Sequence, residues 1–279
     1  MNIRGLFKII VPALAIIMGA TFTSVYSKDA NKVIIKGSTT ILPITQIAIE
    51  QYPDAAAGKV KFSLDGSGSG NGIKALLDGN CDIANSSRNM KKEEFADAKT
   101  KKIAVKEIAI AWDMIVPIVN PENPVKNLTM AQLKAIFDGT IKNWKEIDGK
   151  TDMKIVAVSR ESSSGTYEYW HEAVMKKTDI RSDALQQASN GAVVSTVAGN
   201  KKAIGYVGFG YLNNSIKAVN VNGVVPTLPN AKAKVYPITR LLYMYVNLNN
   251  YSDNAKKFVQ FLLGKQGQEV VKKAGYIPL

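Results

Sequence analysis

The sequence predicts an α/β protein with two lobes, and three observations support this. Short runs of β-forming residues alternate with helical patterns along the chain, which is typical of βα units that build sheets with parallel strands. Two extended stretches, residues 107–120 and 234–247, are longer than the mean strand of about five to six residues, and we expect them to cross between the lobes. Three turns between a strand and a helix are rich in Ser, Thr and Gly. These turns define the candidate site.

The N-terminal residues predict a secretory signal peptide, residues 1–27. Arg4 and Lys8 precede an apolar run from residue 9 to residue 20, and small and polar residues follow up to Ser27. The apolar run is shorter than the ~20 residues that span a bilayer and contains Pro12, which disfavours a retained membrane anchor. No cysteine lies near the expected cleavage site. We therefore expect a soluble periplasmic protein without a lipid anchor.

The remaining elements follow from local patterns. Strands are expected where β-forming residues run together, at residues 33–36, 59–64, 155–158 and 203–208. Helices are expected where the pattern is helical, at residues 41–51, 72–77, 167–176, 254–263 and 267–274. Residues 120–124 contain two prolines and are predicted to form a turn.

The two long stretches determine the expected lobes. If both cross between the lobes, the chain leaves lobe one near Asp113 and returns near Arg240. Residues 28–112 and 241–279 then form lobe one, and residues 113–240 form lobe two. Two connections between lobes are suited to hinge closure around a ligand.

The composition disfavours a nucleic-acid-binding protein and a protein with disulfides or a cysteine-bound metal. Removal of residues 1–27 leaves 34 Lys and Arg against 23 Asp and Glu, a net charge of +11. The lysines are scattered in short pairs without the interleaved aromatic residues of a base-stacking surface, so we expect no nucleic-acid partner. The single cysteine, Cys81, excludes an intramolecular disulfide and a cysteine-cluster metal site. We expect Cys81 to be a buried small apolar residue.

The three hydroxyl-rich turns support a binding function. They are residues 37–40, residues 66–72 and residues 162–166. Each turn places free backbone N–H groups and the positive end of a helix toward one ligand. A single turn of this kind is most simply a helix N-cap. Three of them, one following Arg160, favour a site for a polyanion, because hydroxyls, amides and a guanidinium are the donors that an oxyanion needs.

Enzyme motifs are incomplete in this chain. Residues 66–72 lack the third glycine of a dinucleotide-binding turn, and Lys74 does not have the spacing of a phosphate-binding nucleotide loop. His171 is the one histidine, so neither a metalloprotease motif nor a second histidine ligand is present. Ser67 stands two residues before Ser69, where a serine hydrolase elbow requires glycine. We expect no catalysis, no cofactor and no metal.

Several motifs together resemble the substrate-binding component of bacterial phosphate ABC transporters, over nearly the whole mature chain. They are residues 37–40, residues 65–72, residues 82–88, residues 160–166, residues 203–206 and residues 275–279. The resemblance implies a two-lobed periplasmic-binding-protein fold of type II, in which each lobe is a mixed sheet flanked by helices. It also implies inorganic phosphate as the ligand and the membrane subunits of an ABC transporter as the partner. We expect a monomer.

The resemblance also implies the phosphate-binding residues. Carried over by position, they are Thr39, Thr40, Ser69, Ser87, Ser164, Gly165 and Thr166, with Arg160 as the charged donor.

One position departs from the family pattern. Better-known members have an acidic residue where this chain has Ser87, and that acid accepts the proton of phosphate and rejects sulfate. The candidate replacements are Asp113, our first choice, and then Asp65 and Glu161. An alternative role for Asp113 is a hinge carboxylate paired with Arg240.

Three other functions stay open at this point. Sulfate, molybdate or tungstate would fit the same set of donors. An exported phosphatase is the enzyme alternative, and the absence of metal-ligand clusters in the sequence disfavours it. A nucleic-acid-binding or adhesion protein rests on net charge alone.

Overall fold

The computed structural model describes residues 31–279, and the predicted signal peptide lies outside the described residues. Nine strands form one curled mixed sheet in the order β2-β1-β3-β11-β4-β8-β6-β7, with β9 paired to β4. A separate pair joins β10 to β5. Strand pairing is parallel near both ends of the long sheet and antiparallel around β11 and β4. The α/β class expected from the sequence is confirmed.

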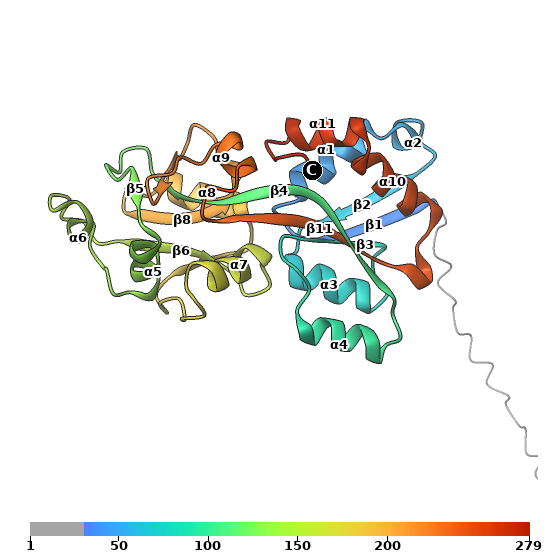
Figure 1. The fold of residues 1–279 in the computed structure, drawn as a ribbon, viewed down its shortest axis with the longest axis horizontal. Helices are drawn as coiled ribbons and strands as arrows, with labels where there is room; N and C mark the ends of the chain where they lie inside the picture. The colour runs from blue at the N-terminus through green and yellow to red at the C-terminus, as the bar shows by residue number, and fades with distance from the viewer. Residues whose placement is uncertain (1–30) are drawn as a thin grey trace, which may run out of the picture.

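One half of the molecule is built on β1 and is called the β1 half. Its strands are β1 (Lys32–Gly37), β2 (Lys61–Asp65) and β3 (Ile83–Ser86). Its helices are α1 (Leu42–Gln51), α2 (Pro53–Ala56), α3 (Ser69–Leu77), α4 (Lys92–Thr100), α10 (Asp253–Leu263) and α11 (Lys265–Lys273). Helices cover this part of the sheet from both sides (Figure 1).

The other half is built on β8 and is called the β8 half. Its strands are β5 (Asn127–Leu128), β6 (Val156–Arg160), β7 (Leu185–Gln187), β8 (Ala203–Gly208), β9 (Lys217–Ala218) and β10 (Asn220–Val221). Its helices are α5 (Met130–Asp138), α6 (Lys145–Asp148), α7 (Gly165–Ala173), α8 (Asn190–Ala198) and α9 (Leu228–Lys232).

Two long strands, β4 (Val105–Val119) and β11 (Thr239–Asn247), run side by side across the middle of the molecule (Figure 1). The first part of β4 pairs with β11, and its last part, Ile115 to Val119, pairs with β8. Strand β4 matches the stretch predicted at residues 107–120. The prediction for residues 234–247 was wrong at its start, because Lys234 has a φ of +57° and the chain turns there before β11 begins.

Two helices that border the candidate site begin earlier than predicted. Helix α3 begins at Ser69 and α7 at Gly165, within the hydroxyl-rich turns. Ser164 caps α7, since its Oγ accepts hydrogen bonds from the N–H groups of Thr166 and Tyr167 at 3.2 and 3.3 Å. The turns are therefore the first turns of helices, whose N–H groups have no partner within the helix.

Apolar side chains form a separate core in each half. In the β8 half, Trp170 and Tyr206 stack with ring centroids 4.2 Å apart, and Phe137 packs against the edge of both. In the β1 half, one cluster includes Val33 and Phe258, and Cys81 belongs to another. Cys81 is buried as predicted. Within residues 31–279, none of the helices combines the length and the apolar character needed to cross a bilayer.

Candidate functional site

The first residues of several helices come together where the two halves meet. Ser69 opens α3, Gly165 opens α7 and Asn190 opens α8, while the turn that carries Thr39 and Thr40 leads into α1. Helix N-termini carry a partial positive charge and free N–H groups. This arrangement creates a local excess of hydrogen-bond donors, which is suited to an anion.

Two contacts across the interface bring these turns together. The hydroxyl oxygens of Thr40 and Thr166 lie 2.9 Å apart, and the N–H of Gly70 donates to the carbonyl of Ser163 at 3.0 Å. Gly165 has no room for a side chain, because a Cβ there would lie 2.3 Å from the hydroxyl oxygen of Ser69. Only glycine at this position permits the two helix N-termini to approach so closely.

Ser69 and Ser87 face Gly165 from the β1 half. The N–H of Ser87 donates to Ser69 Oγ at 3.1 Å, and the two hydroxyl oxygens lie 3.4 Å apart. Both side chains are fully buried. All residues of the expected phosphate-binding set are buried: Thr39, Thr40, Ser69, Ser87, Arg160, Ser164, Gly165 and Thr166. The structure thus brings the whole set into one cluster.

Arg160 supplies a charged donor to this cluster. Its Nε donates to the carbonyl of Gln187 at 3.0 Å, and its Nη2 donates to the carbonyl of Ala188 at 2.9 Å and to Thr39 Oγ1 at 3.2 Å. Its Nη1 is buried and finds no acceptor among residues 31–279. Burial lowers the pKa of Arg160 to about 10. A bound anion would satisfy Nη1 and oppose this shift.

Arg240 on β11 has the opposite character, because all its donors are engaged by the protein. Its Nε and Nη2 donate to Asp113 Oδ2 at 3.1 and 2.8 Å, and its Nη1 donates to the carbonyls of Ser87 and Gly165 at 3.0 and 3.4 Å. Its Nη2 also contacts Thr166 Oγ1 at 3.0 Å. One guanidinium therefore connects turns from both halves.

Asp113 is fully buried and paired with Arg240. Its Oδ1 accepts a hydrogen bond from the N–H of Phe209 at 3.0 Å. Burial raises the pKa of the Asp113 carboxyl, and the charge of Arg240 opposes this rise. The pairing with Arg240, predicted as the alternative role of Asp113, is confirmed, and both carboxylate oxygens are occupied by donors from the protein.

The other two candidate acceptors lie elsewhere. Asp65 ends β2 with an exposed side chain, and Glu161 follows β6 and is also exposed. The cluster is buried, so neither carboxylate is positioned to accept a proton within it. Their proposed role is corrected on this ground: each is next to a turn in sequence, but its side chain faces solvent.

Three residues of the site were not identified from the sequence. Asn190, fully buried, donates from Nδ2 to the hydroxyls of Thr39 and Thr40 at 3.0 and 3.2 Å. The hydroxyl of Tyr276 donates to the carbonyl of Thr40 at 2.6 Å, and that of Tyr211 donates to the carbonyl of Thr39. Asn190 lies in a polar turn, as the other site residues do, but the strand before it has only three residues and gives no clear pattern in the sequence.

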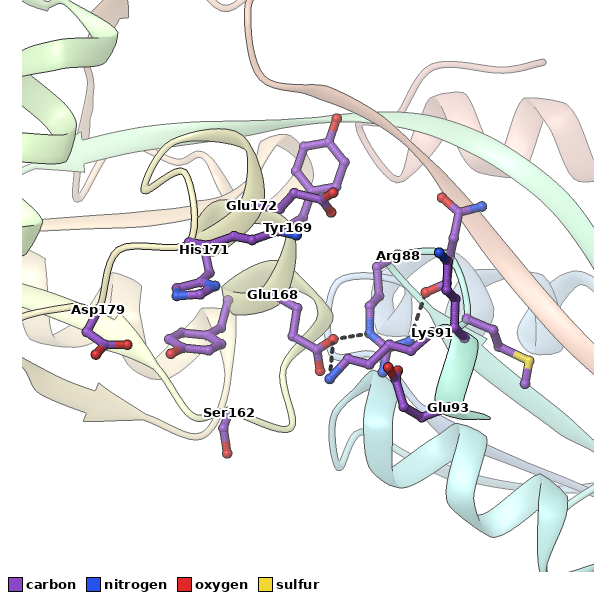
Figure 2. A pocket seen from close by; sticks show the side chains of 14 residues that line it. Arg88, Lys91, Glu93, Ser162, Glu168, Tyr169, His171, Glu172 and Asp179 are labelled. Carbon is purple, nitrogen blue, oxygen red and sulfur yellow. Dashed lines mark hydrogen bonds and ion pairs between the residues drawn. The ribbon is translucent and has the colours of Figure 1, made fainter. Parts of the chain in front are cut away.

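A cleft of about 650 Å³ lies between the halves beside this cluster (Figure 2). Arg88 follows Ser87 and forms an ion pair with Glu168 of α7, while Lys91 Nζ lies 3.0 Å from the same carboxylate. Figure 2 shows Arg88 and Lys91 from the β1 half pointing toward Glu168. The halves are therefore in contact at the cleft as well as at the buried cluster.

Comparisons with known proteins identify the family. The model of the PBP superfamily domain matches residues 24–266. The phosphate-binding protein PstS of Staphylococcus aureus is 36% identical over 253 residues, which cover 86% of this chain and 76% of that protein. The chain belongs to the PstS family of the PBP superfamily.

Solved structures of PstS-like proteins share the fold. A Clostridium perfringens protein described as a phosphate ABC transporter substrate-binding protein, solved with bound phosphate, is 36% identical, with a TM-score of 0.84. The comparison covers 89% of this chain and 100% of that one. An ABC-type phosphate transport receptor from Vibrio cholerae is 30% identical over 88% of this chain and 100% of its own, with a TM-score of 0.71. The two-lobed type II fold expected from the sequence is confirmed.

Proposed function

We propose that this protein binds inorganic phosphate between its two halves and delivers it to an ABC importer. One observation carries the proposal: Nη1 of Arg160 is buried without an acceptor among the described residues, at the point where several helix N-termini meet. A tetrahedral oxyanion supplies the missing acceptors and the opposite charge. The similarity to PstS proteins supports phosphate as that anion.

The mechanism is capture without any bond being made or broken. The open protein exposes half of the donors on each half, and the anion couples them when the halves close about β4 and β11. Closure replaces water with donors that the fold already holds in place. Each hydrogen bond to the charged ligand contributes about 1.5–3 kcal/mol, and the cost of association and closure is subtracted from their sum.

The same proposal includes how the chain is organised and where it acts. We assign residues 28–112 and 241–279 to lobe one and residues 113–240 to lobe two. Residues 1–27 are removed on export, the mature protein is a periplasmic monomer, and the membrane subunits of the importer recognise its closed form. The protein has no catalytic role.

Calorimetry on the purified mature protein tests the proposal. After exhaustive dialysis against a chelator, we expect phosphate to bind with a stoichiometry of one, because protein side chains and amides supply the donors. Addition of Mg²⁺ or Zn²⁺ should not change the affinity. A protein that binds no phosphate, or binds it only after a metal is restored, would contradict the proposal.

Asp113→Asn tests whether Asp113 accepts the proton of phosphate. Because Arg240 and Phe209 already occupy both oxygens, we expect the substitution to change the affinities for phosphate and sulfate in the same direction and leave their ratio unchanged. Titrations with each anion at one pH measure the ratio. A phosphate affinity that falls toward the sulfate value would return the acceptor role to Asp113, since an unpaired polar site discriminates by roughly 10⁴–10⁵.

A further inference from the structure

The orientation of the Asn190 side chain is determined by its neighbours. Its Oδ1 accepts a hydrogen bond from the N–H of Gly208 at 3.2 Å, within the β8 half. The amide nitrogen therefore faces the opposite half, where Nδ2 donates to the hydroxyl oxygens of Thr39 and Thr40 at 3.0 and 3.2 Å. Both N–H hydrogens of Asn190 are used in these two bonds.

These bonds determine what the hydroxyl of Thr39 can do. A hydroxyl has one hydrogen to donate and two lone pairs to accept with. Thr39 Oγ1 accepts from Asn190 at 3.0 Å and from Nη2 of Arg160 at 3.2 Å, which occupies both lone pairs. Its hydrogen is the one group left to interact with a ligand.

The same count gives a direction to the bond between Thr40 and Thr166. Nη2 of Arg240 has two hydrogens: one is donated to Asp113 Oδ2 at 2.8 Å, and the other is shared between Thr166 Oγ1 at 3.0 Å and Thr40 Oγ1 at 3.4 Å. Because Asn190 also donates to Thr40 Oγ1 at 3.2 Å, Thr40 has two donors and Thr166 has one, which directs the hydrogen of Thr40 to Thr166 Oγ1. Thr166 Oγ1 accepts this bond and the shared hydrogen of Arg240, so its lone pairs are occupied in turn. The hydrogen of Thr166 is then free to donate.

We propose that Asn190 is a positioning residue that fixes the hydroxyls of Thr39, Thr40 and Thr166 as a one-way series of donors, and that this favours anion oxygens that carry no proton. The inference rests on the proposed function and deepens it. Asn190 acts on Thr166 through Thr40, so removal of Asn190 changes a hydroxyl that it does not bond.

A double-mutant cycle between Asn190→Ala and Thr166→Val tests this relay. We expect each single substitution to weaken phosphate binding at pH 8 by about tenfold or more, the effect of one hydrogen bond to a charged group. The loss of phosphate affinity in the double variant should be smaller than the product of the two single losses. Without the Thr166 hydroxyl, the direction of the hydrogen bond between Thr40 and Thr166 can no longer affect binding. Calorimetry gives the three affinities.

Two further variants complete the experiment. Asn190→Asp keeps the acceptor for Gly208 but replaces the donor by an acceptor, so the Thr39 and Thr40 hydroxyls turn toward it. It should bind phosphate more weakly than Asn190→Ala, and its affinity should improve as the pH is lowered to 6 and phosphate gains a proton. Ser195→Ala, at an exposed position on α8, is the matched control and should bind as the wild type does.

The outcomes separate the two hypotheses. Independent, multiplicative losses in the cycle, or wild-type affinity in Asn190→Asp, would overturn the relay while leaving phosphate binding intact. A wild-type protein that binds no phosphate would overturn both. Unfolding in the absence of phosphate is the control for correct folding. Asn190→Asp should have the stability of the wild type, because it keeps the bond from Gly208 and because the bonds to the threonines join halves that are apart in the open protein.

Discussion

Arg160→Ala is expected to weaken phosphate binding by roughly two to four orders of magnitude. The substitution removes the donor whose Nη1 is buried without an acceptor in the part of the chain that the structure describes, so a bound anion would lose its charged partner. Breaking a buried charge pair costs about 3–5 kcal/mol, and each 1.4 kcal/mol is about a tenfold change in Kd. Calorimetry with phosphate measures the loss directly.

Two comparison variants separate charge from geometry. Arg160→Lys keeps the positive charge but loses the planar fork that also contacts Gln187 and Ala188, so we expect an intermediate affinity. Ser69→Ala removes one neutral donor and should cost about 1.5–3 kcal/mol. If Arg160→Ala and Ser69→Ala bound phosphate equally well, Arg160 would not contact the anion.

The turns could be identified from the sequence because their signal is local. A strand followed by Ser, Thr and Gly and then by a helix describes the first turns of α3 and α7, and these residue types are favoured at helix N-termini. The prediction placed the helix starts too late, since Ser69 and Gly165 already have helical backbone conformation. This error does not affect the site, because the donors belong to the first turn in either case.

Neither the site position of Asn190 nor the contacts of Arg240 could be predicted from local sequence patterns. The turn at Asn190 follows β7, a strand of three residues that is too short to produce a clear pattern. Arg240 lies opposite Asp113 in the register of β11 and β4, and the distance in sequence between them is 127 residues. The sequence predicted the pair as one of two alternatives, but not its contacts to Ser87 and Thr166.

Asp65 and Glu161 show the limit of reasoning from adjacency. Glu161 follows Arg160, which is 2% exposed, and successive residues of an extended segment point to opposite sides. Asp65 lies opposite Lys36 in the register of β2 and β1. Both carboxylates are next to the turns in sequence and yet face solvent. Proximity in sequence to a binding turn therefore does not place a side chain in the site.

Arg240→Met is expected to lower the free energy of unfolding by about 3–5 kcal/mol, the cost of leaving one charge of a buried pair without its partner. Arg240 and Asp113 are 1% and 0% exposed, so solvent does not replace the lost charge. Without Arg240, burial is opposed only by backbone donors, and the pKa of Asp113 in the folded state rises further above its ordinary value. Urea unfolding measures the loss.

The pH dependence of this variant has a definite sign. A carboxyl whose pKa is higher in the folded protein binds more protons when folded than when unfolded, so stability falls as the pH rises from the unfolded pKa through the folded one. The deficit of Arg240→Met relative to the wild type should therefore be smaller at pH 5 than at pH 8. A deficit that did not depend on pH would show that Asp113 has the same protonation in the folded variant as in the folded wild type at both values.

The double variant Arg240→Met with Asp113→Leu separates the stability of the pair from its role in binding. Replacing both members of a buried ion pair by apolar residues of similar volume is often neutral or stabilising, so most of the lost stability should return. Phosphate affinity should not return, because the carbonyls of Ser87 and Gly165 and the hydroxyl of Thr166 still lack the donors that align them. Full recovery of affinity would show that the turns align without Arg240. Recovery of stability alone would show that Arg240 of β11 is needed to align the binding turns of the two halves.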